Sequence, residues 1–260
     1  MPDGSARQTS ISLGARRTVL SYAHERPVHL GSSLSVLDIL DALLRRVEAR
    51  TAAAGALRSP VVLSKGHAVW ALYALLAERG HGRYRDPVGL PGHPTDGFPG
   101  VDVATGALGH GLSIGAGLAE GYRLDRVERS VYVVLGDGEL NEGSVWEAVM
   151  FAAHRHLDRL VVVVDVNGLQ QEGPTDDVLC LTPLAPKWQS FGWSVIEVDG
   201  HDPVALGAAL DQAEREPVPS VVLARTVKGR GVTFMENSLR WHVGRLDDDQ
   251  LAEALRELED

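Results

Sequence analysis

The stretch VYVVLGDGELNEGSVWEAVMFAAHRHLDRLVVVVDVN, residues 131–167, decides the fold class. A short β-rich run, Val131 to Leu135, ends in a glycine-rich turn. Apolar residues then recur at helical spacing between Glu142 and His156, and Asn141 is placed to cap that helix. Leu160 to Val166 is apolar at nearly every position, as expected for a strand covered on both faces. This order predicts a βαβ unit with two parallel strands.

The same alternation continues toward the C-terminus. We expect a third strand at Trp193 to Val198, a helix at Pro203 to Arg215 and a fourth strand at Ser220 to Arg225. The first half is more helical, with amphipathic stretches at Leu34 to Arg50 and Ala68 to Arg79. The sequence therefore predicts an α/β fold with a central, mostly parallel sheet flanked by helices.

Composition excludes several classes of function. The chain has 260 residues and a formal charge of −10, which argues against nucleic acid or an anionic membrane as the main partner. Its single cysteine, Cys180, can form neither an internal disulfide nor a thiolate metal cage, so we expect a reducing, cytoplasmic location. The longest apolar run is far shorter than the roughly 20 residues needed to span a bilayer, and the first ten residues contain no signal-peptide pattern.

Glycine is abundant, at 28 of 260 residues, and it is concentrated around Gly92 to Gly117 and Gly136 to Gly143. Gly80 to Gly117 is dense in Gly, Pro and His, which is compatible with an exposed loop. A structureless loop of this length inside a compact domain is often functional, so a role in a site is the alternative. The acidic end from Asp247 to Asp260 is most simply an exposed terminal helix.

Two polar residues follow neighbouring predicted strands. Asp137 comes after the first strand, and Asn167 directly follows the next strand along the chain. If these strands pair in parallel, both side chains face the crevice in which open α/β sheets bind ligands. Carboxylate and amide oxygens suit Mg²⁺ or Ca²⁺, and Gly136 and Gly138 let the backbone approach a phosphate. The pattern predicts a metal-bridged diphosphate site.

Residues 136–173, GDGELNEGSVWEAVMFAAHRHLDRLVVVVDVNGLQQEG, resemble the thiamine-diphosphate signature of the transketolase family. Further segments resemble that family's landmarks in the same order: LSKGHAVWALYALLAERG (63–80), GHPTDGFPGVDVATGALGHG (92–111), TDDVLCLTPLAPKWQSFGW (175–193), VKGRGVTFMEN (227–237) and Trp241-His242. The resemblance runs from about Val19 to His242. It implies the thiamine-diphosphate-binding fold, with residues 1–260 as a single domain that binds the diphosphate and its metal.

The resemblance also implies roles for individual residues. Asp137, Asn167 and the backbone carbonyl of Leu169 would hold the Mg²⁺ or Ca²⁺ ion, and the N–H of Gly138 would reach the diphosphate. Glu142 resembles an acidic residue in a carboxylate network that links two active sites at the subunit interface. The residues implied to bind the cofactor are His67, Gly106, Leu108, Gly136, Asp137, Gly138, Glu139, Asn167 and His242.

Four histidines belong to matching motifs and would line the cleft above the thiazolium ring: His29, His67, His93 and His242. Ketol transfer moves protons on sugar hydroxyls near neutral pH, which suits imidazole. We expect His67 and His242 near the diphosphate, with His29, His93 and His242 reaching substrate oxygens. Five others are expected to be structural or merely exposed: His24, His81, His154, His156 and His201.

The resemblance ends near His242, before the family's pyrimidine-binding and C-terminal domains. The implied protein is the N-terminal subunit of a split transketolase, which transfers a two-carbon ketol unit between small sugar substrates. A partner chain would supply the activating glutamate, in an α₂β₂ heterotetramer. Residues near the expected sugar sites depart from the family pattern, which favours a specialised acceptor such as a modified sugar or a carrier-bound thioester: Val28, Ala107, His110 and Val243.

Two alternatives remain open. The chain could belong to another thiamine-diphosphate enzyme, such as a 2-oxoacid dehydrogenase or a deoxyxylulose-phosphate synthase, because these share the Asp…Asn metal motif. It could also be a non-catalytic cofactor-binding subunit. A plain nucleotide-binding protein is disfavoured, because neither GxGxxG after the first strand nor GxxxxGK[ST] is present.

Overall fold

Parallel strands form the centre of the molecule. The computed structural model describes residues 4–54 and 57–259. Within them the sheet has the order β1-β2-β3-β5-β4, and every neighbouring pair is parallel. The strands are β1 (Val61–Leu63), β2 (Val131–Gly136), β3 (Leu160–Val166), β4 (Ser194–Asp199) and β5 (Ser220–Arg225). The prediction of an α/β fold with a parallel sheet is confirmed.

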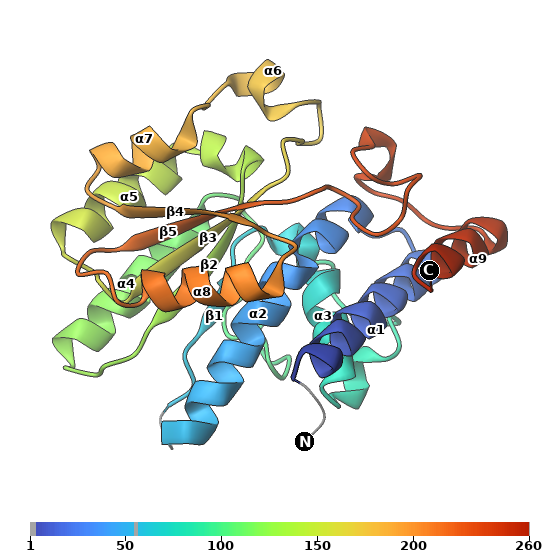
Figure 1. The fold of residues 1–260 in the computed structure, drawn as a ribbon, viewed down its shortest axis with the longest axis horizontal. Helices are drawn as coiled ribbons and strands as arrows, with labels where there is room; N and C mark the ends of the chain where they lie inside the picture. The colour runs from blue at the N-terminus through green and yellow to red at the C-terminus, as the bar shows by residue number, and fades with distance from the viewer. Residues whose placement is uncertain (1–3, 55–56, 260) are drawn as a thin grey trace.

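Helices cover both faces of this sheet (Figure 1). One face carries α1 (Gly4–Glu25), α2 (Leu30–Ala54), α3 (Val69–Glu78) and α8 (Pro203–Ala213), and the other carries α4 (His110–Leu124), α5 (Gly143–His154) and α7 (Leu184–Ser190). Successive residues of β3 point to opposite faces, so Val161 joins the first core and Val162 the second. This two-sided burial explains the uninterrupted apolar run of β3.

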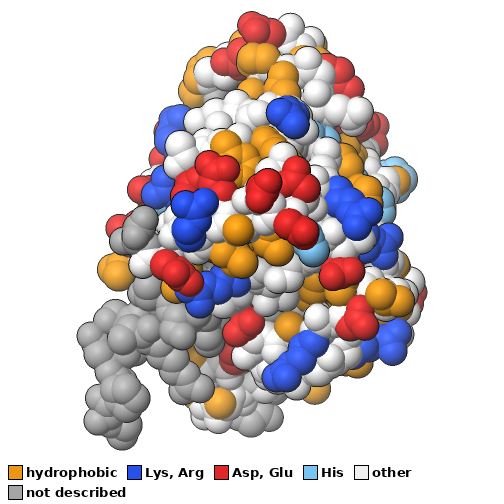
Figure 2. Space-filling model, turned by 90° about the vertical axis from the view of Figure 1, so that its right-hand side faces the viewer, with side chains coloured by type: hydrophobic (Ala, Val, Ile, Leu, Met, Phe, Trp, Pro, Cys, Tyr) orange, Lys and Arg blue, Asp and Glu red, His pale blue; other side chains and the backbone are white. Residues whose placement is uncertain are grey.

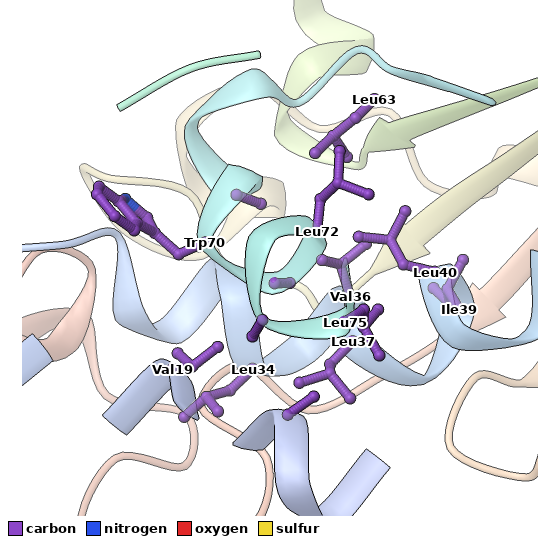
Figure 3. Packing of buried hydrophobic residues seen from close by; sticks show 14 of the residues in the cluster. Val19, Leu34, Val36, Leu37, Ile39, Leu40, Leu63, Trp70, Leu72 and Leu75 are labelled. Carbon is purple, nitrogen blue, oxygen red and sulfur yellow. The ribbon is translucent and has the colours of Figure 1, made fainter. Parts of the chain in front are cut away.

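The first core joins the N-terminal helices to the sheet. Val19 of α1, Leu34 and Leu37 of α2 and Leu75 of α3 are fully buried and lie together in one cluster (Figure 3). Helix α3 is buried on all sides from Val69 to Ala77, so the prediction of an amphipathic stretch at Ala68 to Arg79 is wrong. This packing fixes the position of α2, and therefore of His29, the residue directly before its first turn.

Helix α4 replaces part of the segment that the sequence suggested as a loop. Its glycines are typical of loops, yet two of them are required by close packing. A Cβ at Gly111 would lie 2.4 Å from Cβ of Ser64, and one at Gly115 would lie 2.3 Å from Cγ2 of Val133. The helix therefore approaches the sheet more closely than a helix with larger residues at these positions could. Helix α1 and the short strand β1 also lie outside the elements predicted from sequence.

The remainder of that segment, residues 80–109, is mostly exposed, as a surface loop would be, but a few buried residues anchor it. A 3₁₀ turn (Gly82–Tyr84) begins it, and the buried Tyr84 ring stacks on Tyr73 with 4.9 Å between ring centroids. The Tyr84 hydroxyl donates to the carbonyl of Pro99 at 2.6 Å. These contacts anchor the segment and carry His93 toward the carboxyl ends of the strands.

The predicted cap of α5 is wrong. Asn141 ends a 3₁₀ turn (Gly138–Asn141), and the cap position belongs to Glu142, whose backbone is extended. The N–H of Glu142 closes that turn on Glu139 at 3.0 Å, and its carbonyl accepts from Val145. Asn141 donates instead to the carbonyl of Leu179, at the end of α6 (Thr175–Leu179). The intervening turn shifts the helix start by one residue.

The C-terminal segment begins after a 3₁₀ turn (Leu239–Trp241) and ends in α9 (Asp248–Glu257). Asp247 and Gln250 form a reciprocal capping box at the start of α9, which packs on α1. The expected terminal helix is confirmed. On the face at the right of Figure 1, acidic and basic side chains are interspersed (Figure 2). Across residues 4–54 and 57–259, no helix is both long and apolar enough to cross a bilayer.

Candidate functional site

A cavity of about 440 Å³ opens at the carboxyl ends of the central strands. Every residue that the sequence predicted for the site lines it: His29, His67, His93, Gly106, Leu108, Gly136, Asp137, Gly138, Glu139, Glu142, Asn167, Leu169 and His242. Segments as distant in sequence as α2 and the 3₁₀ turn before His242 therefore meet at one place. Ser32, Lys65, Gln170 and Lys228 line the same cavity and had no predicted role.

Asp137 and Asn167 follow neighbouring strands, as predicted. Gly136 of β2 pairs with Asp165 of β3, so the two strands end side by side. Oδ2 of Asp137 accepts the N–H of Gly168 at 2.6 Å, and Oδ1 of Asn167 accepts the N–H of Leu169 at 3.1 Å. The first bond holds the turn after β3 against Asp137, and the second lies within the turn after β3.

The environment of Asp137 disfavours its ionised form, which a nearby cation would stabilise. Burial, followed by the negative charge of Asp165, raises the pKa of Asp137 to about 6. Among the described residues there is no group of three or more His, Cys, Asp or Glu side chains placed to hold a metal ion. The oxygen donors predicted for a metal, the Asp137 carboxylate, the Asn167 amide and the Leu169 carbonyl, belong to residues that all line the cavity. This set fits Mg²⁺ or Ca²⁺ when phosphate oxygens and water complete the shell.

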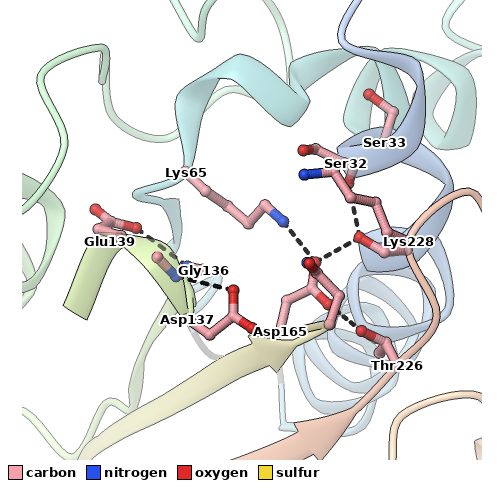
Figure 4. Close-up of polar contacts among 12 residues, drawn as sticks. Ser32, Ser33, Lys65, Gly136, Asp137, Glu139, Asp165, Thr226 and Lys228 are labelled. Carbon is pink, nitrogen blue, oxygen red and sulfur yellow. Dashed lines mark hydrogen bonds and ion pairs between the residues drawn. The ribbon is translucent and has the colours of Figure 1, made fainter. Parts of the chain in front are cut away.

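A buried ion pair lies beneath the cavity (Figure 4). Nζ of Lys65 is 2.5 Å from Oδ2 of Asp165, and both side chains are almost fully buried. Ser35 and Thr226 also donate to the Asp165 carboxylate. Burial opposes its ionisation, but Lys65 and these hydrogen bonds outweigh burial and hold the pKa of Asp165 below its ordinary value. The sequence already indicated that Asp165 is unusual, because it is the one charged residue in the apolar run LVVVVDV.

Lys228 brings a second buried cation to the cavity. Its Nζ donates to the carbonyl of Leu169 at 2.9 Å and lies 3.1 Å from Nδ1 of His242. Burial, with repulsion from Lys65, lowers the pKa of Lys228 to about 8. An ammonium group only donates, so Nδ1 of His242 accepts and the ring proton lies on Nε2. Asp165 balances the charge of Lys65, so of these two lysines Lys228 is the one whose charge can act on an anionic group in the cavity.

The four predicted histidines meet in this cavity. Their ring centroids are 5.2 Å apart for His29 and His67, 5.5 Å for His29 and His242, and 6.5 Å for His29 and His93. Burial lowers the pKa of His29 and lowers that of His67 further, with added repulsion from His93 and Lys65 respectively. Burial and Lys228 lower the pKa of His242 to about 4. These three imidazoles are therefore neutral at pH 7.

The histidines expected to be structural lie outside this cavity. His24 pairs with Asp248 at 2.7 Å, and His201 pairs with Asp38 at 2.8 Å. The remaining three, His81, His154 and His156, are exposed.

Glu139 acts on its surroundings through three hydrogen bonds. Its carboxylate accepts from the N–H of Gly109 at 2.8 Å, from the N–H of Gly136 at 3.2 Å and from the hydroxyl of Ser64. It therefore ties the starts of α4 and of the turn after β2 to the end of β1. Burial raises the pKa of Glu139. Glu142, by contrast, is exposed at the rim.

The N–H of Gly138 donates within the chain, to Oδ1 of Asp137 at 2.8 Å. A Cβ at Gly138 would lie 2.8 Å from Oε1 of Gln170, so a larger residue here would require the Gln170 side chain to move. The backbone here is accessible from the cavity, as a close phosphate contact requires.

A parallel sheet with a polar, lysine- and histidine-lined cavity at its carboxyl edge defines an α/β cofactor-binding domain. The family model described as "Transketolase, thiamine diphosphate binding domain" matches residues 18–259. The chain belongs to the transketolase family, and it corresponds to the thiamine-diphosphate-binding subunit of two-chain members. The predicted family and fold are confirmed.

Individual relatives support this assignment. One subunit of the apulose-4-phosphate transketolase of Phocaeicola vulgatus is 38% identical over 249 residues, which cover 88% of this chain and 85% of the relative. A 6-deoxy-6-sulfo-D-fructose transketolase subunit of a Clostridium species is 37% identical, covering 89% and 88%. The solved transketolase of Campylobacter jejuni superposes with a TM-score of 0.84 at 25% identity. That match covers 97% of this chain and 42% of the solved one.

Proposed function

We propose that this chain is the N-terminal subunit of a two-chain, thiamine-diphosphate-dependent transketolase. It transfers a two-carbon ketol unit from a ketose phosphate donor to an aldose or a specialised acceptor. The observation that carries the proposal is the meeting of Asp137 and Asn167 with four histidines around one cavity. The names of relatives with similar length, both subunits of transketolases, support the two-chain arrangement.

The polar floor of the cavity fits the diphosphate and its metal. Asp137, Asn167 and the Leu169 carbonyl would hold Mg²⁺ or Ca²⁺, and the charge of the cation would favour the ionised form of the buried Asp137. Lys228 would neutralise diphosphate charge. The other residues proposed to contact the cofactor are His67, Gly106, Leu108, Gly136, Gly138, Glu139 and His242.

When bound, thiamine diphosphate supplies a carbanion at its thiazolium carbon that accepts the ketol unit. The chain's own contribution would be hydrogen bonding to the substrate by the histidines that line the cavity. Neutral His29 would present one N–H and one lone pair to substrate hydroxyls, which lets it orient a sugar and move its proton, and the ring of His93 would offer further hydrogen bonds to the same hydroxyls. His242 would act as a donor through Nε2–H, since its lone pair is engaged by Lys228.

The partner chain would complete the site. In this proposal it supplies the pyrimidine-binding domain and the activating glutamate, and Glu142 joins a carboxylate network at the interface within an α₂β₂ assembly. The exposure of Glu142 at the cavity rim supports this placement.

The acceptor is proposed to be a modified sugar or a carrier-bound thioester, because residues near the expected sugar sites depart from the family pattern. The relatives' names specify unusual sugars, one of them a ketose, which supports modified sugars among the substrates. Among the departures from the family pattern, His110 and Val243 are exposed, at the start of α4 and next to His242. Val28 is buried and pairs with Gly244 through two hydrogen bonds of 3.0 Å. That bridge holds the backbone of His29 beside that of His242.

Reconstitution tests the proposal. The chain is mixed with a candidate C-terminal transketolase subunit, thiamine diphosphate and Mg²⁺, and products from ketose phosphate donors and a panel of aldoses are identified by mass spectrometry. We expect two-carbon transfer by the pair and none by either chain alone. Transfer by this chain alone would contradict the two-chain arrangement. Decarboxylation of a 2-oxoacid without ketol transfer would favour the alternative enzyme class.

A further inference from the structure

A second polar cluster lies outside the cofactor cavity, where α1 and α2 meet the turn after β4. Nδ1 of His201 is 2.8 Å from Oδ2 of Asp38, which also accepts from Nη2 of Arg16 at 2.5 Å. Nε2 of His201 lies 2.8 Å from the backbone nitrogen of Val227. The cluster borders a separate cavity of about 360 Å³.

The hydrogen bonds determine the tautomer of His201. A backbone N–H always donates, so Nε2 carries the lone pair that accepts from Val227. The ring proton is therefore on Nδ1 and is donated to Asp38. Burial alone raises the pKa of Asp38, but the hydrogen bond from His201 and the charge of Arg16 outweigh it and hold this pKa below its ordinary value. Both ring nitrogens are occupied, so His201 has no lone pair available for a substrate.

Val227 begins the segment that carries Lys228 into the cofactor cavity. After β5 ends at Arg225, the N–H of Thr226 bonds to the carbonyl of Val166, and the N–H of Gly229 bonds to the carbonyl of Gly31, each at 3.0 Å. The N–H of Val227, which lies between them, is held by the side chain of His201. Of these three backbone N–H bonds, it is the one that depends on residue identity; the hydroxyl of Thr226 adds a side-chain bond to Asp165.

The turns after β4 and β5 also interlock directly. The N–H of Gly200 donates to the carbonyl of Arg225 at 2.7 Å, and a Cβ at Gly200 would lie 2.5 Å from Cγ2 of Thr226. The main chain next to His201 thus lies against the main chain that precedes Lys228. A substitution at His201 should therefore directly affect the backbone conformation of residues 226–228.

We infer that His201, oriented by Asp38, is a positioning residue that holds Lys228 in the cofactor cavity. The hydrogen bond to Val227 sets the backbone direction at Lys228, and this direction aims Nζ at Leu169 and His242. The inference rests on the proposed function for the identity of the ligand, a diphosphate, but the placement of Lys228 is measurable without it.

Three variants test the inference. His201→Leu removes the acceptor for Val227. His201→Gln keeps an amide oxygen to accept from Val227 and an amide N–H to donate to Asp38. His24→Leu is the matched control, because His24 also pairs with an aspartate, Asp248, but on the surface. Thermal unfolding of each variant shows whether it folds.

The first readout is the rate at which Lys228 of the free chain reacts with an amine-modifying reagent, followed by mass spectrometry. We expect slow modification in the parent chain, where Lys228 is only 1% exposed. His201→Leu should react several-fold faster, whereas His201→Gln and His24→Leu should react at the parent rate. Equal rates in the parent chain and a folded His201→Leu variant would overturn the inference. If His201→Leu does not fold, a parent-like rate in His201→Gln supports it and an increased rate overturns it.

The second readout is thiamine diphosphate affinity of the reconstituted two-chain complex, measured by calorimetry with Mg²⁺. His201→Leu should raise Kd about tenfold, the effect of losing one hydrogen bond, and His201→Gln should restore most of the affinity. Unchanged Kd in His201→Leu would contradict the inference. If the parent complex itself does not bind thiamine diphosphate, the proposed function fails, while the modification rates still decide the role of His201.

Discussion

Nζ of Lys228 lies 3.1 Å from Nδ1 of His242, so a buried ammonium group holds a cavity imidazole in one tautomer. The same ammonium donates to the carbonyl of Leu169. One lysine, 59 positions after Leu169 and 14 before His242, therefore links the turn after β3 to the segment that carries His242.

Replacing this lysine should weaken diphosphate binding. In Lys228→Met, the cofactor loses a charged hydrogen-bond donor, and hydrogen bonds to charged groups contribute about 1.5–3 kcal/mol. We expect Kd for thiamine diphosphate to rise by one to two orders of magnitude in calorimetry with the reconstituted complex. Lys187→Met is the control, because Lys187 lies outside the cavity. Equal affinities for both variants would exclude a direct role for Lys228.

Asp137→Asn should abolish the Mg²⁺ dependence of cofactor binding. The substitution removes the one carboxylate in the proposed metal set and leaves the amide of Asn167 and a carbonyl, which bind a divalent cation weakly. Calorimetric titration with and without Mg²⁺ measures this difference directly. Asp158→Asn, at the opposite end of β3, should keep the parent response. A variant that still shows full Mg²⁺ dependence would place the metal elsewhere.

Much of this site is predictable because its residues follow strands. Asp137 and Asn167 each come directly after an apolar run, and parallel pairing then brings them together. The partnership of Lys65 with Asp165 is not predictable in this way, because it joins two residues 100 positions apart that share no local pattern. The same holds for Val28 and Gly244, whose bridge brings His29 beside His242. Helix α4 was missed because tight packing on β1 requires the residues that ordinarily signal a loop.

The buried pair of Lys65 and Asp165 should be strongly coupled in stability. Lys65→Met leaves the fully buried Asp165 without its cation, and breaking such a pair costs about 3–5 kcal/mol. Lys65→Met with Asp165→Asn removes both charges and should recover a large part of that loss. Urea unfolding of the parent, both single variants and the double variant measures the coupling. Additive effects of the two single changes would show that the pair contributes nothing as a pair.

Stability should respond to acid through His242. The pKa of His242 is about 4 in the folded chain and 6.5 in the unfolded chain, so between these values the unfolded state binds more protons. The stabilisation from neutral His242 is complete above pH 6.5 and is lost as pH falls toward 4. His242→Gln lacks this titration. The parent's free energy of unfolding should therefore fall more steeply than the variant's between about pH 7 and pH 5.

Asp137 titrates in the same range but is present in both proteins, so its contribution cancels in the comparison. Parallel pH profiles for the parent and His242→Gln would mean that His242 keeps an ordinary pKa. Urea unfolding at half-unit pH steps, with cofactor and metal omitted, provides the measurement.

Two glycines of α4 should respond oppositely to alanine. A Cβ at Gly111 would lie 2.3 Å from Oγ and 2.4 Å from Cβ of Ser64, so Gly111→Ala must push α4 away from the end of β1. That shift also strains the hydrogen bond from Ser64 to Glu139. Overpacking of this kind costs about 1–3 kcal/mol of stability. Gly117 lies in the same helix, is exposed and has no atom within 4 Å of the place that a Cβ would take, so Gly117→Ala should stabilise by about 0.5–1 kcal/mol. Urea unfolding compares the two, and a Gly111→Ala variant as stable as Gly117→Ala would show that α4 does not need its close approach to the sheet.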